Sequence, residues 1–228
     1  ELTKRILSGV ILAALLLGDV WVGEGWFAAL LVVGGLILAR EYLRLIWRGW
    51  PSATARALWT IFGILYIGAA IVGLWVARST EEGFFVTMVL FGVVWATDIG
   101  AYAFGRMIGG PKIAPSISPS KTWAGLIGGI VTVAAFILVV FSFRTEQWPN
   151  QWGIALPLSM IGSVLIAIIA QTGDFFESWL KRRAGMKDSG ALIPGHGGLF
   201  DRIDLKILST APLHYGATWT ALPSAIER

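Results

Sequence analysis

The feature that most constrains this chain is a series of apolar segments, each about as long as a membrane is thick. A helix needs about 20 mostly apolar residues to cross the hydrocarbon core of a bilayer. Windows of that kind predict six membrane spans, at residues 6–22, 26–46, 57–77, 85–104, 122–143 and 154–173. A seventh window, 205–222, contains Lys206, Pro212 and His214, which leave open whether it crosses the membrane, re-enters it or lies on its surface. We therefore expect an all-α fold, a polytopic transmembrane helical bundle with polar loops on the cytoplasmic side.

The composition supports a membrane protein and excludes several kinds of chemistry. Only 14% of the 228 residues are charged, against about 25% in soluble domains. The chain has no cysteine, so disulfides, thiolate metal sites and a cysteine nucleophile are excluded. The formal net charge is +4, but the basic residues lie beside the apolar windows. This placement favours anionic lipid or a phosphate-bearing substrate as the partner and argues against nucleic acid.

The segments that connect the windows alternate in their predominant charge along the chain. If the six windows cross the membrane in turn, 15 of the 18 lysines and arginines fall on one side. The positive-inside rule makes that side cytoplasmic. The N-terminus and the polar segments 105–121 and 174–204 are therefore predicted to face the cytoplasm. We divide the chain into N-terminal membrane helices, residues 1–84, and a catalytic membrane region, residues 85–228.

Asp98 lies inside the fourth apolar window. A carboxylate at that depth needs a cation, hydrogen bonds or water. We interpret it as a metal or cation contact, and the alternative is a helix-packing aspartate hydrogen-bonded to a neighbouring span. Two glycines, Gly100 and Gly105, flank Tyr102 and would let another helix approach closely.

The segment before the fifth window combines prolines, hydroxyl side chains and two lysines, and it leads into a helix. Backbone N–H groups at a helix start attract anions. Ser118, Ser120, Lys121 and Thr122 could add hydroxyl and ammonium donors to a phosphate. The alternative is an ordinary capped helix with a lysine that extends toward the membrane surface. The segment is not a Walker loop, because the required glycine and lysine spacing is absent.

A stripe of polar residues begins near the end of the sixth window and continues beyond it. Gln171, Asp174, Glu177, Ser178 and Lys181 are spaced so that a continued helix places them on one face. Asp174 is the first choice for a divalent-cation ligand. Glu177 could assist it or pair with Lys181 four residues on.

The segment after this stripe concentrates charge and glycine. Asp201 and Asp204 are three residues apart and follow a glycine-rich run that contains His196. Several carboxylate oxygens suit Mg²⁺, which usually bridges protein and substrate phosphates. His196 could be a general base, a hydrogen-bond donor to phosphate or an orienting residue. Arg182, Arg183 and Lys187 could be a positive-inside collar only, whereas Lys181 and Arg202 are closer to the acids and are better candidates for contact with substrate phosphate.

Three segments, in the same order, resemble phosphatidate cytidylyltransferases, also called CDP-diacylglycerol synthases. They are D-I-G-A-Y-A-F-G-R at 98–106, S-P-S-K-T-W-A-G at 118–125, and S-W-L-K-R-R-A-G-M-K-D-S-G-A-L-I-P-G-H-G-G-L-F-D-R-I-D at 178–204. The last is highly specific. A weaker similarity covers residues 4–13.

The resemblance implies a polytopic inner-membrane enzyme, commonly a homodimer, that condenses CTP with phosphatidic acid to give CDP-diacylglycerol and pyrophosphate. It implies Mg²⁺ dependence, with K⁺ as a second candidate cation. The acid of the family's G-D-x-x-E-S motif and the first acid of D-R-x-D correspond to Asp174 and Asp201. Ala124 departs from the family, whose members often carry Glu or Gln there.

The candidate residues fall into three groups. The predicted catalytic residues are Lys121, Lys181, Asp188, His196 and Arg202; the predicted substrate-binding residues are Ser118, Ser120, Lys121, Thr122, Ser178, Lys181, Arg182, Lys187 and Arg202; the predicted metal ligands are Asp98, Asp174, Asp201 and Asp204. Two other functions stay open at this point. One is a CTP-dependent polyprenol or phytol kinase, which transfers the γ-phosphate, and the other is an ion or phosphate transporter.

Overall fold

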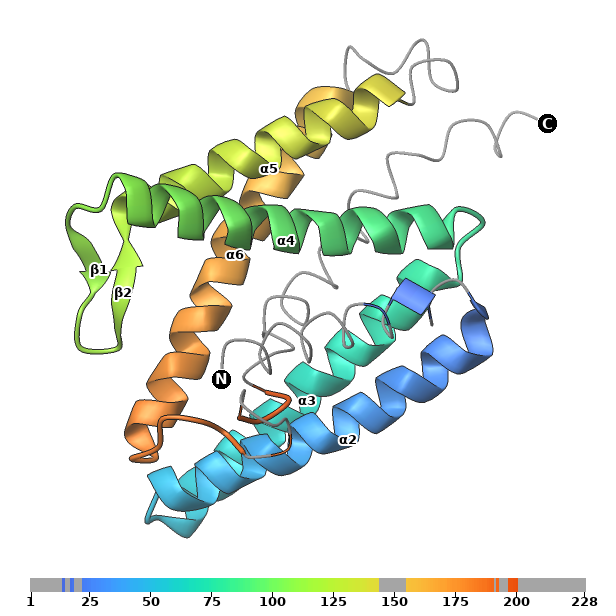
Figure 1. Cartoon of the computed structure of the whole chain (residues 1–228). Helices are drawn as coiled ribbons and strands as arrows, with labels where there is room; N and C mark the ends of the chain where they lie inside the picture. Colours follow the sequence, from blue (N-terminus) through green and yellow to red (C-terminus); the bar gives the residue numbers. More distant parts are fainter. Residues whose placement is uncertain are drawn as a thin grey trace.

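Five long helices and one β-hairpin make up the described part of the chain (Figure 1). The computed structural model describes residues 14, 17–18, 22–143, 155–190, 192 and 197–200. In chain order the elements are α2 (Glu24–Gly49), α3 (Ala53–Arg78), α4 (Gly83–Met107), β1 (Lys112–Ala114), β2 (Ser118–Thr122), α5 (Trp123–Phe143) and α6 (Ala155–Arg183).

The helices of the described residues confirm a multi-pass membrane architecture and account for part of the six or seven spans expected. Four described helices are long and apolar enough to cross a membrane: α3, α4, α5 and the part of α6 from Met160 to Arg183. They correspond to the windows 57–77, 85–104, 122–143 and 154–173. The window 26–46 is helical, as α2, but is not one of the four. Most of the window 6–22 and all of 205–222 lie outside the described residues.

Local signals set the turn between α2 and α3. The Ser52 hydroxyl accepts a hydrogen bond from the Ala55 backbone N–H, which satisfies one of the free donors at the start of α3. Arg56, in the first turn of α3, donates to the Trp50 carbonyl at 2.6 Å and to the Pro51 carbonyl at 3.0 Å. These contacts close a short connection, and α2 and α3 lie side by side in opposite directions (Figure 1).

Glycines let α4 and α5 pack closely, as the sequence predicted for Gly100 and Gly105. A Cβ built on Gly100 would lie 2.6 Å from the Gly128 carbonyl oxygen, and one on Gly105 would lie 3.5 Å from the Gly125 Cα. On the opposite side, a Cβ on Gly125 would lie 2.8 Å from the Ala101 carbonyl oxygen. Small residues at membrane helix interfaces allow backbones to approach in this way.

The expectation of an all-α fold is wrong in one short segment. Residues 112–122 form an antiparallel hairpin in which Lys112 pairs with Thr122 and Ala114 with Ser118. Proline removes a helical hydrogen bond and clashes with the preceding turn, but it is tolerated in turns and in edge strands. Pro111, Pro115 and Pro119 therefore prevent α4 and α5 from joining into one helix, and the hairpin is the result.

Candidate active site

A pocket of about 360 Å³ lies where α4, the β2 strand, the start of α5 and α6 meet. Its size is at the lower end of ordinary ligand-binding pockets. The lining residues are Asp98, Ala101, Tyr102, Gly105, Arg106, Ser120, Lys121, Thr122, Gly125, Leu126, Gln171 and Asp174. The pocket therefore gathers residues from segments that the sequence analysis treated separately.

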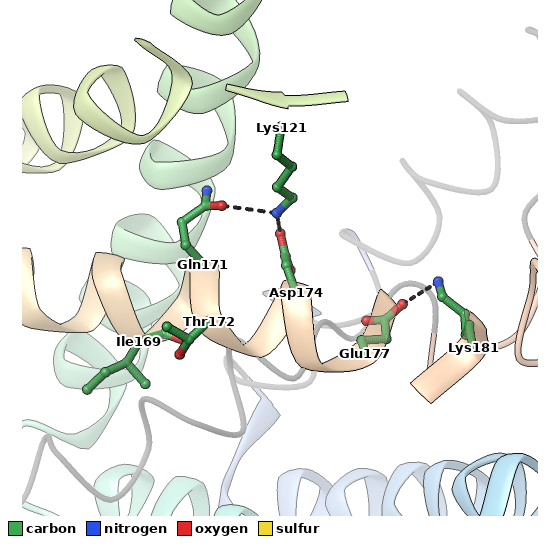
Figure 2. Close-up of polar contacts among 7 residues, drawn as sticks. All are labelled: Lys121, Ile169, Gln171, Thr172, Asp174, Glu177 and Lys181. Atoms are coloured by element: carbon green, nitrogen blue, oxygen red, sulfur yellow. Dashed lines mark hydrogen bonds and ion pairs between the residues drawn. The ribbon is translucent and has the colours of Figure 1, made fainter. Parts of the chain in front are cut away.

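Lys121 is the central cation of this pocket. Its Nζ forms an ion pair with the Asp174 carboxylate and donates to the Gln171 side-chain carbonyl at 3.0 Å (Figure 2). The same nitrogen lies 5.4 Å from the centroid of the Phe175 ring. The side chains of Lys121 and Asp174 are 22% and 11% exposed. A pair this little exposed is screened less by water than a surface pair.

The local folding of three elements explains this geometry. Gln171 and Asp174 are three residues apart on α6, so both point from one face toward Lys121 (Figure 2). Thr122 is the last residue of β2. Its hydroxyl accepts a hydrogen bond from the Gly125 N–H at 3.1 Å, which caps the start of α5. Because α4 and α5 are in glycine contact at this end, Asp98 on α4 lines the same pocket.

The structure brings together part of the predicted site. Asp98, Ser120, Lys121, Thr122 and Asp174 line the pocket, as does Gln171 from the polar stripe. The second group of predicted residues lies beyond it. Ser118 is buried on β2 and does not line the pocket. The pocket lining also leaves out five predicted residues on or after the last turns of α6: Ser178, Lys181, Arg182, Lys187 and Asp188.

Lys181 is engaged in a pair within its own helix. Its Nζ lies 2.7 Å from the Glu177 carboxylate, in the i,i+4 arrangement that was one of the two interpretations of Glu177 (Figure 2). Both side chains are largely buried, at 16% and 7% exposure. Three further predicted residues, His196, Arg202 and Asp204, lie outside the described residues, as does Asp201.

The donor set of the pocket fits a hard divalent cation. Asp98 and Asp174 supply carboxylates, and Gln171 supplies an amide oxygen. Oxygen ligands are those that Mg²⁺ prefers, and it commonly keeps waters and substrate phosphate oxygens in its remaining positions. Within the ranges that the structure describes, no group of three or more His, Cys, Asp or Glu side chains could hold a metal alone. A bound cation would therefore need substrate oxygens, or the two predicted ligands that lie outside those ranges.

The sequence analysis did not assign Arg106, on α4, to the site. Arg106 entered only the count of basic residues on the predicted cytoplasmic side, but it lines the pocket and donates to the Tyr102 hydroxyl at 3.0 Å. The signal was present in the sequence, because Asp98, Tyr102 and Arg106 follow one another at intervals of four. That spacing places them on one face of a helix.

A second missed residue is Glu41, on α2. It is 7% exposed and accepts hydrogen bonds from Ser189, Leu199 and Phe200. Its place in the predicted window 26–46 was a signal of the same kind as Asp98, because a carboxylate in an apolar window needs a partner.

Comparisons with known proteins agree with this geometry. The model of the cytidylyltransferase family matches residues 48–219, which include the whole pocket. A phosphatidate cytidylyltransferase of Brucella suis biovar 1 (strain 1330) is 42% identical over 206 residues, covering 87% of this chain and 70% of that protein. One of Rickettsia typhi (strain ATCC VR-144 / Wilmington) is 33% identical over 213 residues, covering 93% and 90%.

This chain has apolar helices long enough to cross a membrane and a pocket of cations and carboxylates, and it is related to these enzymes. It is therefore a membrane nucleotidyltransferase. The chain belongs to the cytidylyltransferase family.

Proposed function

We propose that this protein is a phosphatidate cytidylyltransferase and that the pocket between α4, β2 and α6 is where its reacting phosphates meet. The reaction condenses CTP with phosphatidic acid to give CDP-diacylglycerol and pyrophosphate. The names of the similar enzymes support the reaction. The observation that supports the location is the Lys121–Asp174 pair, which joins two of the sequence motifs inside one pocket.

In the proposed reaction a phosphate oxygen of phosphatidate attacks the α-phosphorus of CTP. The new bond is between that oxygen and the α-phosphorus. The bond between the α-phosphorus and the oxygen that bridges to the β-phosphorus breaks, and pyrophosphate leaves with the electron pair. No covalent enzyme intermediate is needed, since the phosphatidate oxyanion is itself a good nucleophile. Catalysis then depends on positioning and on stabilisation of charge.

Residues of this chain supply both the positioning and the stabilisation of charge. The Lys121 ammonium and the Arg106 guanidinium are the cations that line the pocket, and we assign them to the phosphate oxygens. Gln171 and Asp174 hold the Lys121 ammonium at a fixed place before substrate arrives. Orientation without rearrangement is what a preorganised site requires.

Mg²⁺ is part of the proposal, and K⁺ is a secondary candidate. Asp98 and Asp174 would hold Mg²⁺ together with Asp201 and Asp204. Bound there, it would neutralise charge on the triphosphate and on the departing pyrophosphate. The oxygen donors of the pocket support this assignment.

The position of the pocket on membrane helices suits a lipid substrate. Next to the pocket, α4 exposes apolar side chains: Ile99 is 66% exposed, Met107 84% and Ile108 67%. Such side chains can contact acyl chains while the headgroup reaches the polar pocket.

We place the pocket and the N-terminus on the cytoplasmic side of the inner membrane, from the positive-inside rule. We also propose that the chain crosses the membrane six or seven times and that two copies form a homodimer.

Product analysis tests the function. The purified protein is incubated with phosphatidate, Mg²⁺ and CTP labelled at either the α- or the γ-phosphate. We expect the α-label in CDP-diacylglycerol and the γ-label in pyrophosphate. Transfer of the γ-label to lipid would instead indicate a lipid kinase, and phosphate or ion flux without nucleotide turnover would indicate a transporter. The names of the relatives favour neither alternative.

A further inference from the structure

The Glu41 carboxylate binds the segment that precedes Asp201. Oε2 accepts from the Phe200 backbone N–H at 2.7 Å and from the Ser189 hydroxyl at 3.0 Å, and Oε1 accepts from the Leu199 N–H at 3.1 Å. These donors are 148 to 159 residues away in the chain. Glu41 therefore joins α2, in the N-terminal helices, to the most specific motif of the catalytic region.

The surroundings of this carboxylate are built for close backbone approach. A Cβ on Gly190 would lie 2.6 Å from Glu41 Oε1, and one on Gly198 would lie 2.4 Å from Glu41 Oε2. Both distances are far below van der Waals contact, so any larger residue would push the segment away from the carboxylate. Ser189 is completely buried. Only glycine at these two positions lets the backbone donors reach Glu41.

An apolar cluster surrounds the contact. Tyr42, next to Glu41, packs its ring 6.2 Å from the Phe200 ring. Leu199 and Phe200 belong to one buried cluster with residues of α2 and α3 and with Leu180 of α6. A buried carboxylate is costly unless it is fully hydrogen-bonded. The pattern of donors satisfies that requirement and gives one position to the segment, which apolar packing alone would not specify.

We propose that Glu41 is a positioning residue: it docks Ser189, Leu199 and Phe200 on α2 and so fixes the point from which the chain continues into Asp201. This inference rests on the proposed function, in which Asp201 is a metal ligand. Phe200 and Asp201 are adjacent, and consecutive Cα atoms are about 3.8 Å apart. We therefore expect loss of the hydrogen bond at Phe200 to act on the proposed metal ligand that follows it in the chain. In this view the N-terminal helices complete the active site without contributing a catalytic residue.

The test compares Glu41→Gln with Tyr42→Phe. Gln keeps the size of the side chain but removes the charge and directs an amide N–H₂ toward a donor. Tyr42→Phe is the matched control, because it removes a buried hydrogen bond, from the Tyr42 hydroxyl to the Trp59 carbonyl, in the same cluster. For Glu41→Gln we expect the Mg²⁺ concentration at half-maximal turnover to rise about tenfold or more, the usual range for partners that orient metal ligands. The KM for phosphatidate should change less than twofold, and Tyr42→Phe should keep the wild-type Mg²⁺ dependence.

A second measurement needs neither metal nor turnover. Hydrogen exchange of the peptide that contains Leu199 and Phe200 is measured without Mg²⁺ in wild type and both variants. The amides of these residues should exchange faster in Glu41→Gln and not in Tyr42→Phe. Equal protection in wild type and Glu41→Gln, or an unchanged Mg²⁺ dependence, would overturn the proposal.

If Glu41→Gln does not fold, Ser189→Ala decides, since it removes one donor and keeps the carboxylate. A two- to threefold rise in the Mg²⁺ requirement, with faster exchange at 199–200, supports the positioning role, and wild-type values overturn it. Wild-type protein without CDP-diacylglycerol synthesis would defeat the proposed function instead. Hydrogen exchange would still decide whether Glu41 docks the segment.

Discussion

Two largely buried carboxylates are used in opposite ways. Asp174 pairs with Lys121 at the wall of a pocket, where substrate can reach both groups. Glu41 lies outside that pocket and is enclosed by backbone N–H groups and a buried hydroxyl. The first arrangement leaves charge where a ligand can use it, whereas the second uses charge to fix a segment of backbone. Burial of an acid in a membrane protein therefore does not by itself identify a catalytic group.

The largest effect is expected from Asp174→Asn. It removes the charge that holds Lys121 and the proposed metal ligand, so turnover of CTP should fall about 1,000-fold, the upper range for loss of one preorganised electrostatic group. Turnover is measured as CDP-diacylglycerol formed per enzyme. Thr172→Ala is the control, because Thr172 is exposed on α6 and its hydroxyl donates to the Ile169 carbonyl of the same helix. Activity of Asp174→Asn within twofold of wild type would remove Asp174 from the active site.

Lys121→Met comes next. We expect kcat/KM for CTP to fall about 100-fold, since one charge-assisted contact to phosphate is lost. The double variant with Asp174→Asn should lose much less than the product of the two single losses, because paired residues are not additive. Fully multiplicative losses would show that the two residues act separately and would contradict the pairing.

Arg106→Gln should act mainly on binding. Its guanidinium lines the pocket beside Tyr102, so we expect the KM for CTP to rise about tenfold, the value of one hydrogen bond to a charged group. The matched control is Arg48→Gln, an exposed arginine near the end of α2 whose side chain reaches Met186. An equal effect of both changes would point to general attraction of anions by the basic face.

The smallest effect concerns stability in the Glu41 region. Gly198→Ala places a methyl group against the Ser189 hydroxyl and the Glu41 carboxylate. Overpacking of this kind costs about 1–3 kcal/mol, so thermal unfolding in detergent should occur at a lower temperature. Gly162→Ala on α6 meets nothing within 4 Å and should leave the melting temperature unchanged or raise it. A wild-type melting temperature for Gly198→Ala would show that the segment can shift freely, unlike the pocket wall.

Hydropathy and helical periodicity predicted what is local. Four of the expected spans are long apolar helices, because about 20 apolar residues in sequence can satisfy their backbone only as a helix in lipid. The polar stripe on α6 follows from spacing alone, and the spacing offered the pair between Glu177 and Lys181 as one of two interpretations of Glu177. The same reasoning extended to Asp98 and Arg106 would have found the α4 wall of the pocket.

The sequence by itself determined the solvent of this protein, the helices that this solvent requires and the faces on which their polar groups lie. Only the tertiary structure decided which faces meet. Lys121 reaches Asp174 across 53 positions, and Glu41 reaches Phe200 across 159. Such contacts depend on how glycine-lined helices and a proline-rich hairpin pack, and packing between distant segments has no period that a sequence can display.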